Sequence, residues 1–209
     1  MIEPAFFEVV LGQRACRSFT DEDVPDDDLV RVLEAAVHAP SAENAQPWVF
    51  VVVREAARRA AIADLTRRLW EDHARAHAEG RLETRLLVDV DQATAAGFGG
   101  APVLVVVAGD TRSGTPRRAL PSSVLPAVQN LLLAAAALGY GSALTTLATM
   151  AASELGSLLE LPEGVEPLAV VPIGRPARPL GPPRRLPVPA KAHRERYGQP
   201  FGERPGARG

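Results

Sequence analysis

Residues 124–138 are apolar almost all round, and this limits the possible folds of the 209-residue chain more than any other feature. A helix without a polar face has to be buried, so we expect these residues to pack against a sheet, with a second subunit as a further candidate partner. Ser122 and Ser123 stand directly before this stretch and are expected to cap the helix. Gly139 and Gly141 follow it and predict a turn from helix to strand.

Three apolar, β-branched runs predict the strands of that sheet. They lie at residues 48–53, 102–108 and 168–173, and residues 142–147 suit either a strand or a loop. Helices are predicted at residues 4–12, 25–39, 56–78 and 152–159, the second of which must end before Pro40. Helices flanking a mixed central sheet place the chain in the α+β or α/β class, and we take α+β.

The whole chain, residues 1–209, is expected to form a single domain. Its last part, residues 175–209, is rich in proline and arginine, and six prolines between positions 176 and 189 predict an extended arm. The composition is that of a globular protein, and the net charge of −2 argues against a nucleic-acid partner. The single cysteine, Cys16, is typical of a reducing compartment. Without a signal peptide or an apolar run of bilayer length, the sequence predicts a cytoplasmic protein with no membrane partner.

Two polar segments carry side chains suited to an organic phosphate. Residues 13–19 contain Arg14 and Arg17, and guanidinium groups make bidentate, charge-assisted bonds to phosphate. Residues 39–48 contain serine, asparagine and glutamine, which offer donors and acceptors for the edge of a heterocycle. Together the segments suggest a ligand with a phosphate at one end and a polar ring at the other.

At these two segments the sequence resembles the nitroreductase family. The family pattern A-P-S-x-x-N-x-Q-P-W is matched at residues 39–48, and the likeness continues in order through residues 126–133, 137–141 and 171–174. The resemblance implies an FMN-dependent oxidoreductase that takes hydride from NAD(P)H onto flavin N5. The electrons then pass to a small organic acceptor such as a nitroaromatic or a quinone. It also implies a nitroreductase-like fold and an intertwined homodimer with the flavin at the interface.

The resemblance further implies which residues bind the flavin. The arginine segment and a late basic pair would hold the phosphate, a loop after the apolar helix would lie against the ring near N5, and the polar loop would come from the opposite subunit. The expected residues of one subunit are Arg14, Ala15, Arg17, Leu144, Thr145, Thr146, Leu147, Arg184 and Arg185, and those of the other are Pro40, Ser41, Asn44 and Ser123. No side chain is expected to act as a general acid or base, because the flavin performs the hydride chemistry.

Gln13 and Ala15 depart from the family pattern, which has arginine and serine at these positions. The loss of a hydrogen bond to a charged group costs about 1.5–3 kcal/mol, so the phosphate site is weakened unless other cations offset the loss. Two alternative functions therefore stay open. One is a flavin-cleaving, dehalogenating or ring-oxidising enzyme of the same fold, and the other is a flavin- or deazaflavin-binding module without redox turnover.

Other reactive residues have simpler interpretations. His73 and His77 have helical spacing, but no third ligand follows with the spacing of a zinc site, so we expect no metal. Cys16 is expected to pack in the core rather than act as a nucleophile. The acceptor pocket is expected somewhere in residues 66–97. No motif there indicates the acceptor or a preference between NADH and NADPH.

Overall fold

The computed structural model describes residues 5–202 and contains a four-stranded sheet in the order β1-β2-β4-β3. The strands are β1 (Trp48–Val53), β2 (Val103–Asp110), β3 (Gly141–Ser142) and β4 (Val165–Gly174). All three strand pairs are antiparallel. The parallel component of the expected mixed sheet is confined to a single bridge between Ala15 and Ser142.

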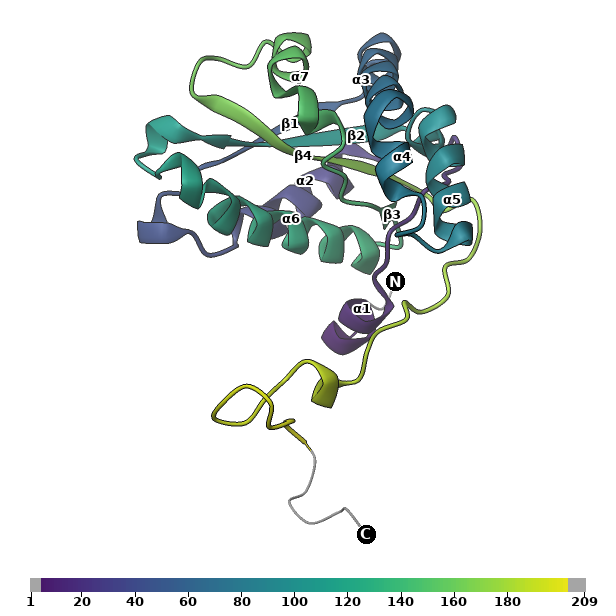
Figure 1. Ribbon diagram of the computed structural model, residues 1–209. Helices are drawn as coiled ribbons and strands as arrows, with labels where there is room; N and C mark the ends of the chain where they lie inside the picture. Colours follow the sequence, from purple (N-terminus) through teal and green to yellow (C-terminus); the bar gives the residue numbers. More distant parts are fainter. Residues whose placement is uncertain (1–4, 203–209) are drawn as a thin grey trace.

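Helices cover both faces of this sheet (Figure 1). The α-helices of the described residues are α1 (Phe6–Gly12), α2 (Asp26–Val37), α3 (Ala56–Leu69), α4 (Arg75–Ala78), α5 (Thr84–Ala95), α6 (Leu120–Ala137) and α7 (Ala152–Leu158). In Figure 1, α2 and α6 lie on one face, and α3, α4, α5 and α7 lie on the other. The α+β class predicted from the sequence is therefore confirmed.

Strand β2 is buried on both sides and divides the core into two clusters. Val103, Val105 and Val107 point into the cluster formed with α2 and α6. Leu104 and Val106 point into the cluster formed with α3 and α7. Because side chains alternate along a strand, the continuous apolar run of β2 serves both clusters at once.

Helix α6 starts earlier than the sequence indicated. It begins at Leu120 with Pro121 in its first turn and has no side-chain cap, so the prediction that Ser122 and Ser123 cap it was wrong. Proline suits the first turn of a helix, because the amide hydrogen that it lacks would have no partner there. Both serines lie inside the helix instead, and Ser123 is buried.

The outward face of α6 carries an exposed apolar side chain next to the exposed apolar side chains of α1. Leu125 is 39% exposed on this face, and the neighbouring helix α1 exposes Phe6, Phe7 and Leu11 by 68%, 72% and 69%. Among the described residues, the stretch Arg117–Ala137 is long and apolar enough by composition to cross a membrane, with a mean hydropathy of 1.4. Its inner side packs on α2 and on the sheet, as the core helix of a globular domain does.

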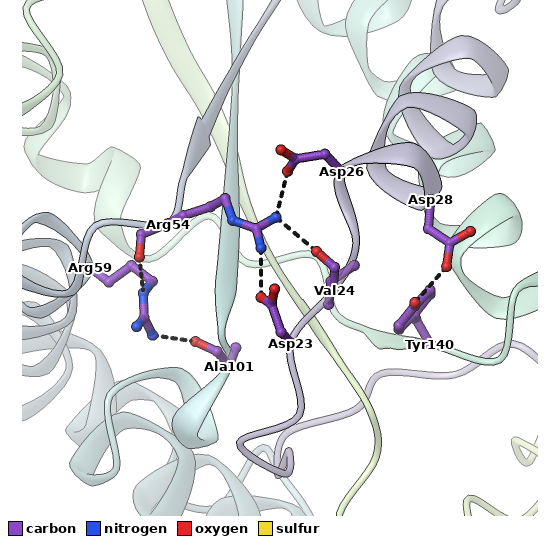
Figure 2. Close-up of polar contacts among 8 residues, drawn as sticks. All are labelled: Asp23, Val24, Asp26, Asp28, Arg54, Arg59, Ala101 and Tyr140. Carbon is purple, nitrogen blue, oxygen red and sulfur yellow. Dashed lines mark hydrogen bonds and ion pairs between the residues drawn. The ribbon is translucent and has the colours of Figure 1, made fainter.

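An arginine directly after β1 fixes the chain that leads into α2 (Figure 2). The Arg54 guanidinium donates to the Val24 carbonyl oxygen at 2.8 Å, to Asp26 Oδ1 at 2.7 Å and to Asp23 Oδ1 at 2.6 Å. Both carboxylates are largely exposed, so each ion pair contributes little by itself. The bond to the backbone carbonyl ties the start of α2 to the edge of the sheet.

A buried tyrosine links the end of α6 to the start of α2. The Tyr140 hydroxyl donates to Asp28 Oδ2 at 2.6 Å (Figure 2), and the Arg175 guanidinium lies 4.2 Å from the centre of the tyrosine ring. Burial, together with the hydrogen bond to Asp28, raises the pKa of Tyr140 to about 12. The phenol is therefore neutral at physiological pH.

Candidate functional site

The arginine segment, residues 13–19, is held between the sheet and the C-terminal arm. The Cys16 amide donates to the Ser142 carbonyl oxygen at 2.9 Å, which docks the segment on β3. On the other side, the Ala177 amide of the arm donates to the Ser18 carbonyl oxygen at 3.0 Å. Backbone bonds from two different parts of the fold thus fix the path of the segment.

Two glycines, Gly99 and Gly141, allow other parts of the backbone to pack closely against this segment. The Phe19 amide donates to the Gly99 carbonyl oxygen at 2.9 Å. A Cβ atom on Gly99 would collide with the carbonyl oxygen of Arg17, and its φ of +68° favours glycine as well. A Cβ atom on Gly141 would lie 2.7 Å from Cys16 Sγ. The segment therefore has little room to shift.

Cys16 is buried in the core, and its thiol donates to the Ser18 carbonyl oxygen at 3.3 Å. Burial raises the pKa of the Cys16 thiol, and this effect exceeds the opposite influence of that hydrogen bond and of Arg17. A thiolate is thus disfavoured, in agreement with the packing role expected from the sequence.

Four arginines surround a small cavity beside the segment. Arg14 and Arg17 come from the segment itself, Arg85 comes from α5 and Arg178 comes from the arm. The cavity has a volume of about 130 Å³, and Asp89 is the one carboxylate among its described lining residues. Four cations against one anion make the cavity strongly electropositive, and its size suits the end of a ligand rather than a whole drug-sized molecule.

Arg17 is the most enclosed of these cations. It is half-buried and makes no hydrogen bond or ion pair within residues 5–202. Burial lowers the pKa of Arg17, although the nearby Asp89 carboxylate opposes this effect. Because a guanidinium stays charged at any physiological pH, a half-buried unpaired one is costly, and an anionic ligand would relieve that cost.

A second cavity is also lined by Arg17 and is mainly apolar. It has a volume of about 140 Å³, and Cys16 and Arg17 line both cavities. Its walls include Val90 from α5, Phe98 and Leu144. A dry protein cavity of about 150 Å³ binds benzene, so this one can hold part of a ring system. A ligand with an anionic end and an aromatic ring would fill both cavities.

Part of the predicted ring-binding loop lines the apolar cavity. Leu144, Thr145 and Leu147 contribute to its wall, whereas Thr146 does not. Thr145 exchanges two backbone hydrogen bonds with Val170 of β4, at 3.0 and 2.8 Å, so the loop is anchored on the sheet. Four residues of the stretch predicted to form the acceptor pocket also line this cavity: Thr66, Val90, Ala93 and Thr94.

Arg184 and Arg185 lie apart from both cavities. Both side chains are exposed, and Arg185 Nη1 donates to the carbonyl oxygen of Arg184 at 3.0 Å. The part of the arm that reaches the basic cavity is residues 178–181, where the Gly181 carbonyl oxygen accepts from Arg14 Nη1 at 3.1 Å. Residues 203–209 of the predicted arm lie outside the described residues.

The polar loop with Pro40, Ser41 and Asn44 lies at the opposite end of α6. The Ala42 amide donates to Ser123 Oγ at 3.1 Å, which attaches the loop to the first turns of α6. Ser41 Oγ accepts from the Gln46 amide at 2.9 Å. Asn44 has a φ of +55°, a conformation that is uncommon for residues other than glycine and that is often found at functional sites.

The length of α6 separates the two halves of the predicted site. The helix has 18 residues, which corresponds to about 27 Å. Its first turns hold the Ser41 loop, and the residues that follow its last turn hold the arginine segment through Ser142. Within one subunit, the Ser41 loop and the arginine segment therefore lie at opposite ends of this helix.

The residues around the arginine segment fit a phosphorylated flavin. The basic cavity offers cations for the phosphate, and the apolar cavity offers walls for a ring. In addition, the Ser142 hydroxyl is buried and has no hydrogen-bond partner within the described part of the chain. An unsatisfied buried hydroxyl is rare in native proteins, and this one lies beside the arginine segment, where it is free to bond to a ligand.

A family model described as the nitroreductase family matches residues 10–175, and the chain therefore belongs to the nitroreductase family. A Methanothermobacter thermautotrophicus protein assigned as an NADH dehydrogenase/NAD(P)H nitroreductase is 29% identical over 91% of this chain and 86% of its own length. The FMN reductase (NAD(P)H) of Bacillus subtilis is 30% identical over 88% of this chain and 71% of its own length.

Solved structures show the same fold. A structure assigned as a nitroreductase of Desulfovibrio desulfuricans in complex with FMN has a TM-score of 0.73 and 27% identity, over 94% of this chain and 99% of its own. An iodotyrosine deiodinase bound to FMN and 3-iodo-L-tyrosine has a TM-score of 0.70 and 26% identity, over 88% of this chain and 97% of its own. The nitroreductase-like fold expected from the motifs is confirmed.

Proposed function

We propose that this protein is an FMN-dependent oxidoreductase that passes electrons from NAD(P)H to a small organic acceptor. The observation that carries the proposal is the half-buried, unpaired Arg17 between a basic and an apolar cavity. When bound, FMN supplies the redox chemistry, since it can take up a hydride and return electrons to a second substrate. The relatives named as NAD(P)H nitroreductase and FMN reductase support the choice of donor and cofactor.

The protein residues bind and orient the flavin in this proposal. Arg14 and Arg17 hold the phosphate through charge-assisted hydrogen bonds, beside the backbone of Ala15. The anchored loop of residues 144–147 presents its backbone to the ring and, with Phe98, excludes water from it. No side chain is assigned a proton-transfer step.

We further propose that the active form is a homodimer in which α6 packs against its symmetry mate. The exposed apolar side chains of α1 and α6 provide the surface. An antiparallel pair of α6 helices would bring the partner's Ser41 loop to the arginine segment, which one subunit cannot do over about 27 Å. Pro40, Ser41, Asn44 and Ser123 would then serve the flavin of the opposite subunit. The arm, with Arg184 and Arg185, would extend towards the partner.

A single domain over residues 1–209 and a cytoplasmic location belong to the same proposal. Both core clusters include residues of β2, which supports one folding unit. The single buried cysteine suits a reducing compartment.

An anaerobic absorption spectrum tests this function. The purified protein is mixed with FMN, then with NADPH, and finally with a quinone or a nitroaromatic compound. We expect flavin bands that bleach with NADPH and return with the acceptor. Protein that binds flavin without NADPH oxidation would indicate a binding module, and irreversible loss of the flavin spectrum in oxygen would indicate a flavin-cleaving enzyme.

A further inference from the structure

Two cations of the basic cavity lie outside the motifs that carry the family resemblance. Arg85 comes from the first turn of α5, and Arg178 comes from the start of the arm. Relying on the proposed FMN cofactor, we propose that Arg85 and Arg178 bind its terminal phosphate. They would thereby replace the arginine and serine that this chain lacks at Gln13 and Ala15.

The position of Arg85 favours this role. Its guanidinium makes no hydrogen bond or ion pair with any residue between 5 and 202, although it lines the cavity together with Arg14 and Arg17. An exposed arginine normally gains by pairing with a neighbouring carboxylate. Here it shares a cavity with three other cations and with one carboxylate, Asp89, so the net charge stays positive and favours the entry of an anion.

Arg178 is held in place by an ion pair with Asp89. Its Nη2 donates to Asp89 Oδ1 at 3.2 Å, and Asp89 lies one helical turn after Arg85 on α5. The backbone next to Arg178 is also fixed, because the Ala177 amide donates to the Ser18 carbonyl oxygen at 3.0 Å. Arg178 therefore reaches the cavity wall on an ordered backbone, whereas Arg184 and Arg185 lie on a part of the arm that does not line it.

Asp89 has two opposing effects in this arrangement. It orients Arg178, but it also places a negative charge at the wall of a cavity meant for a phosphate. A phosphate monoester carries a charge of about −1.5 to −2 at pH 7, so repulsion from Asp89 should exceed the benefit of orientation. Removal of this charge should thus tighten phosphate binding. If Asp89 serves only to orient Arg178, removal of its charge should weaken phosphate binding instead.

The test compares FMN with riboflavin, which lacks the phosphate. Deflavinated full-length protein is titrated with each flavin, and binding is followed by flavin fluorescence, a readout independent of turnover. The variants are Arg85→Gln, Arg178→Gln and Asp89→Asn. Arg118→Gln serves as the matched control, since Arg118 is exposed near the opposite end of α6 and lines neither cavity.

We expect each of the first two variants to raise the Kd for FMN about tenfold and to leave the Kd for riboflavin unchanged. Asp89→Asn should lower the Kd for FMN about threefold, again without an effect on riboflavin. Equal changes for both flavins, or no change for FMN, would overturn the proposal.

Two further outcomes are distinguishable. If the arginine variants change only the preference for NADPH over NADH, these side chains bind the nucleotide 2′-phosphate, and the proposal is wrong. If the wild-type protein binds neither flavin, the proposed FMN function fails first and this inference fails with it.

Discussion

Gly99 sets the position of the Arg17 backbone, and this can be tested at the level of a single atom. Gly99→Ala would push a methyl group against the carbonyl oxygen of Arg17. We expect FMN affinity to fall about tenfold or more while the far-ultraviolet circular dichroism stays native, because the binding segment has to move. Gly80→Ala is the control, since Gly80 also has a positive φ, of +74°, but has open space around it. Equal effects of both substitutions would contradict this role.

Ionisation of Tyr140 should lower the free energy of unfolding at alkaline pH. Its pKa is about 12 in the folded protein, whereas an unfolded tyrosine titrates near pH 10. The stabilisation is therefore complete below pH 10 and is lost as the pH rises towards 12, by about 3 kcal/mol in total.

Urea unfolding of the wild type and of Tyr140→Phe at pH 9 and at pH 11.5 measures this effect. At pH 9 the wild type should be more stable by about 1 kcal/mol, because the hydrogen bond to Asp28 is intact. At pH 11.5 ionisation of the unfolded tyrosine removes about 2 kcal/mol of the wild type's stability, so Tyr140→Phe should then be the more stable protein by about 1 kcal/mol. Every other ionisable group is present in both proteins, so its contribution to the pH dependence cancels. A difference in stability that does not depend on pH would refute the assignment.

At the scale of elements, α6 is expected to form the subunit interface. Leu125→Glu places a charge on its exposed apolar face and should yield monomers in analytical ultracentrifugation. FMN affinity should fall at least about tenfold, because the partner's Ser41 loop is lost. Met150→Glu is a suitable control, since Met150 is 59% exposed in the turn Ala148–Ala151, which lies outside α1 and α6. Monomers that bind FMN as tightly as the wild type would rule out a shared site.

The elements that the sequence predicted well are those with continuous patterns. The β-branched runs of β1, β2 and β4 identify these strands, because such residues favour a buried sheet. The two-residue strand β3 is too short to show a pattern. The start of α6 was misplaced because Ser122 and Ser123 look like caps, although Pro121 already belongs to the first turn. Helix α5 lies within residues 66–97, but the sequence analysis did not predict where it begins and ends.

At the scale of the whole molecule, flavin binding and assembly should reinforce each other. A ligand that binds only the native dimer stabilises it by about 2.7 kcal/mol when its concentration is 100 times the Kd. FMN should therefore raise the Tm and lower the dimer dissociation constant, and riboflavin should do so less at equal concentration. Thermal unfolding and sedimentation at several protein concentrations check both effects. If FMN binds more tightly than riboflavin but leaves the dimer dissociation constant unchanged, the flavin site is not shared between the subunits.

The candidate site was predictable from the sequence only where its residues share a short segment or belong to a stretch that resembles the family. Arg14 and Arg17 were found because they share one short segment. Arg85 and Arg178 were not, because only the packing of α5 and the arm beside that segment brings them to the same cavity. The same limit explains Ser142, whose unsatisfied hydroxyl becomes apparent only once burial is known.

The placement of the Ser41 loop and the arginine segment at opposite ends of α6 has a genetic consequence. Consider two inactive alleles, one defective at Arg17 and the other at Ser41 and Asn44. In a mixed dimer both defects fall on the same flavin site, and the other site is wholly wild-type. Cells that carry both alleles should therefore regain activity that neither allele supports alone.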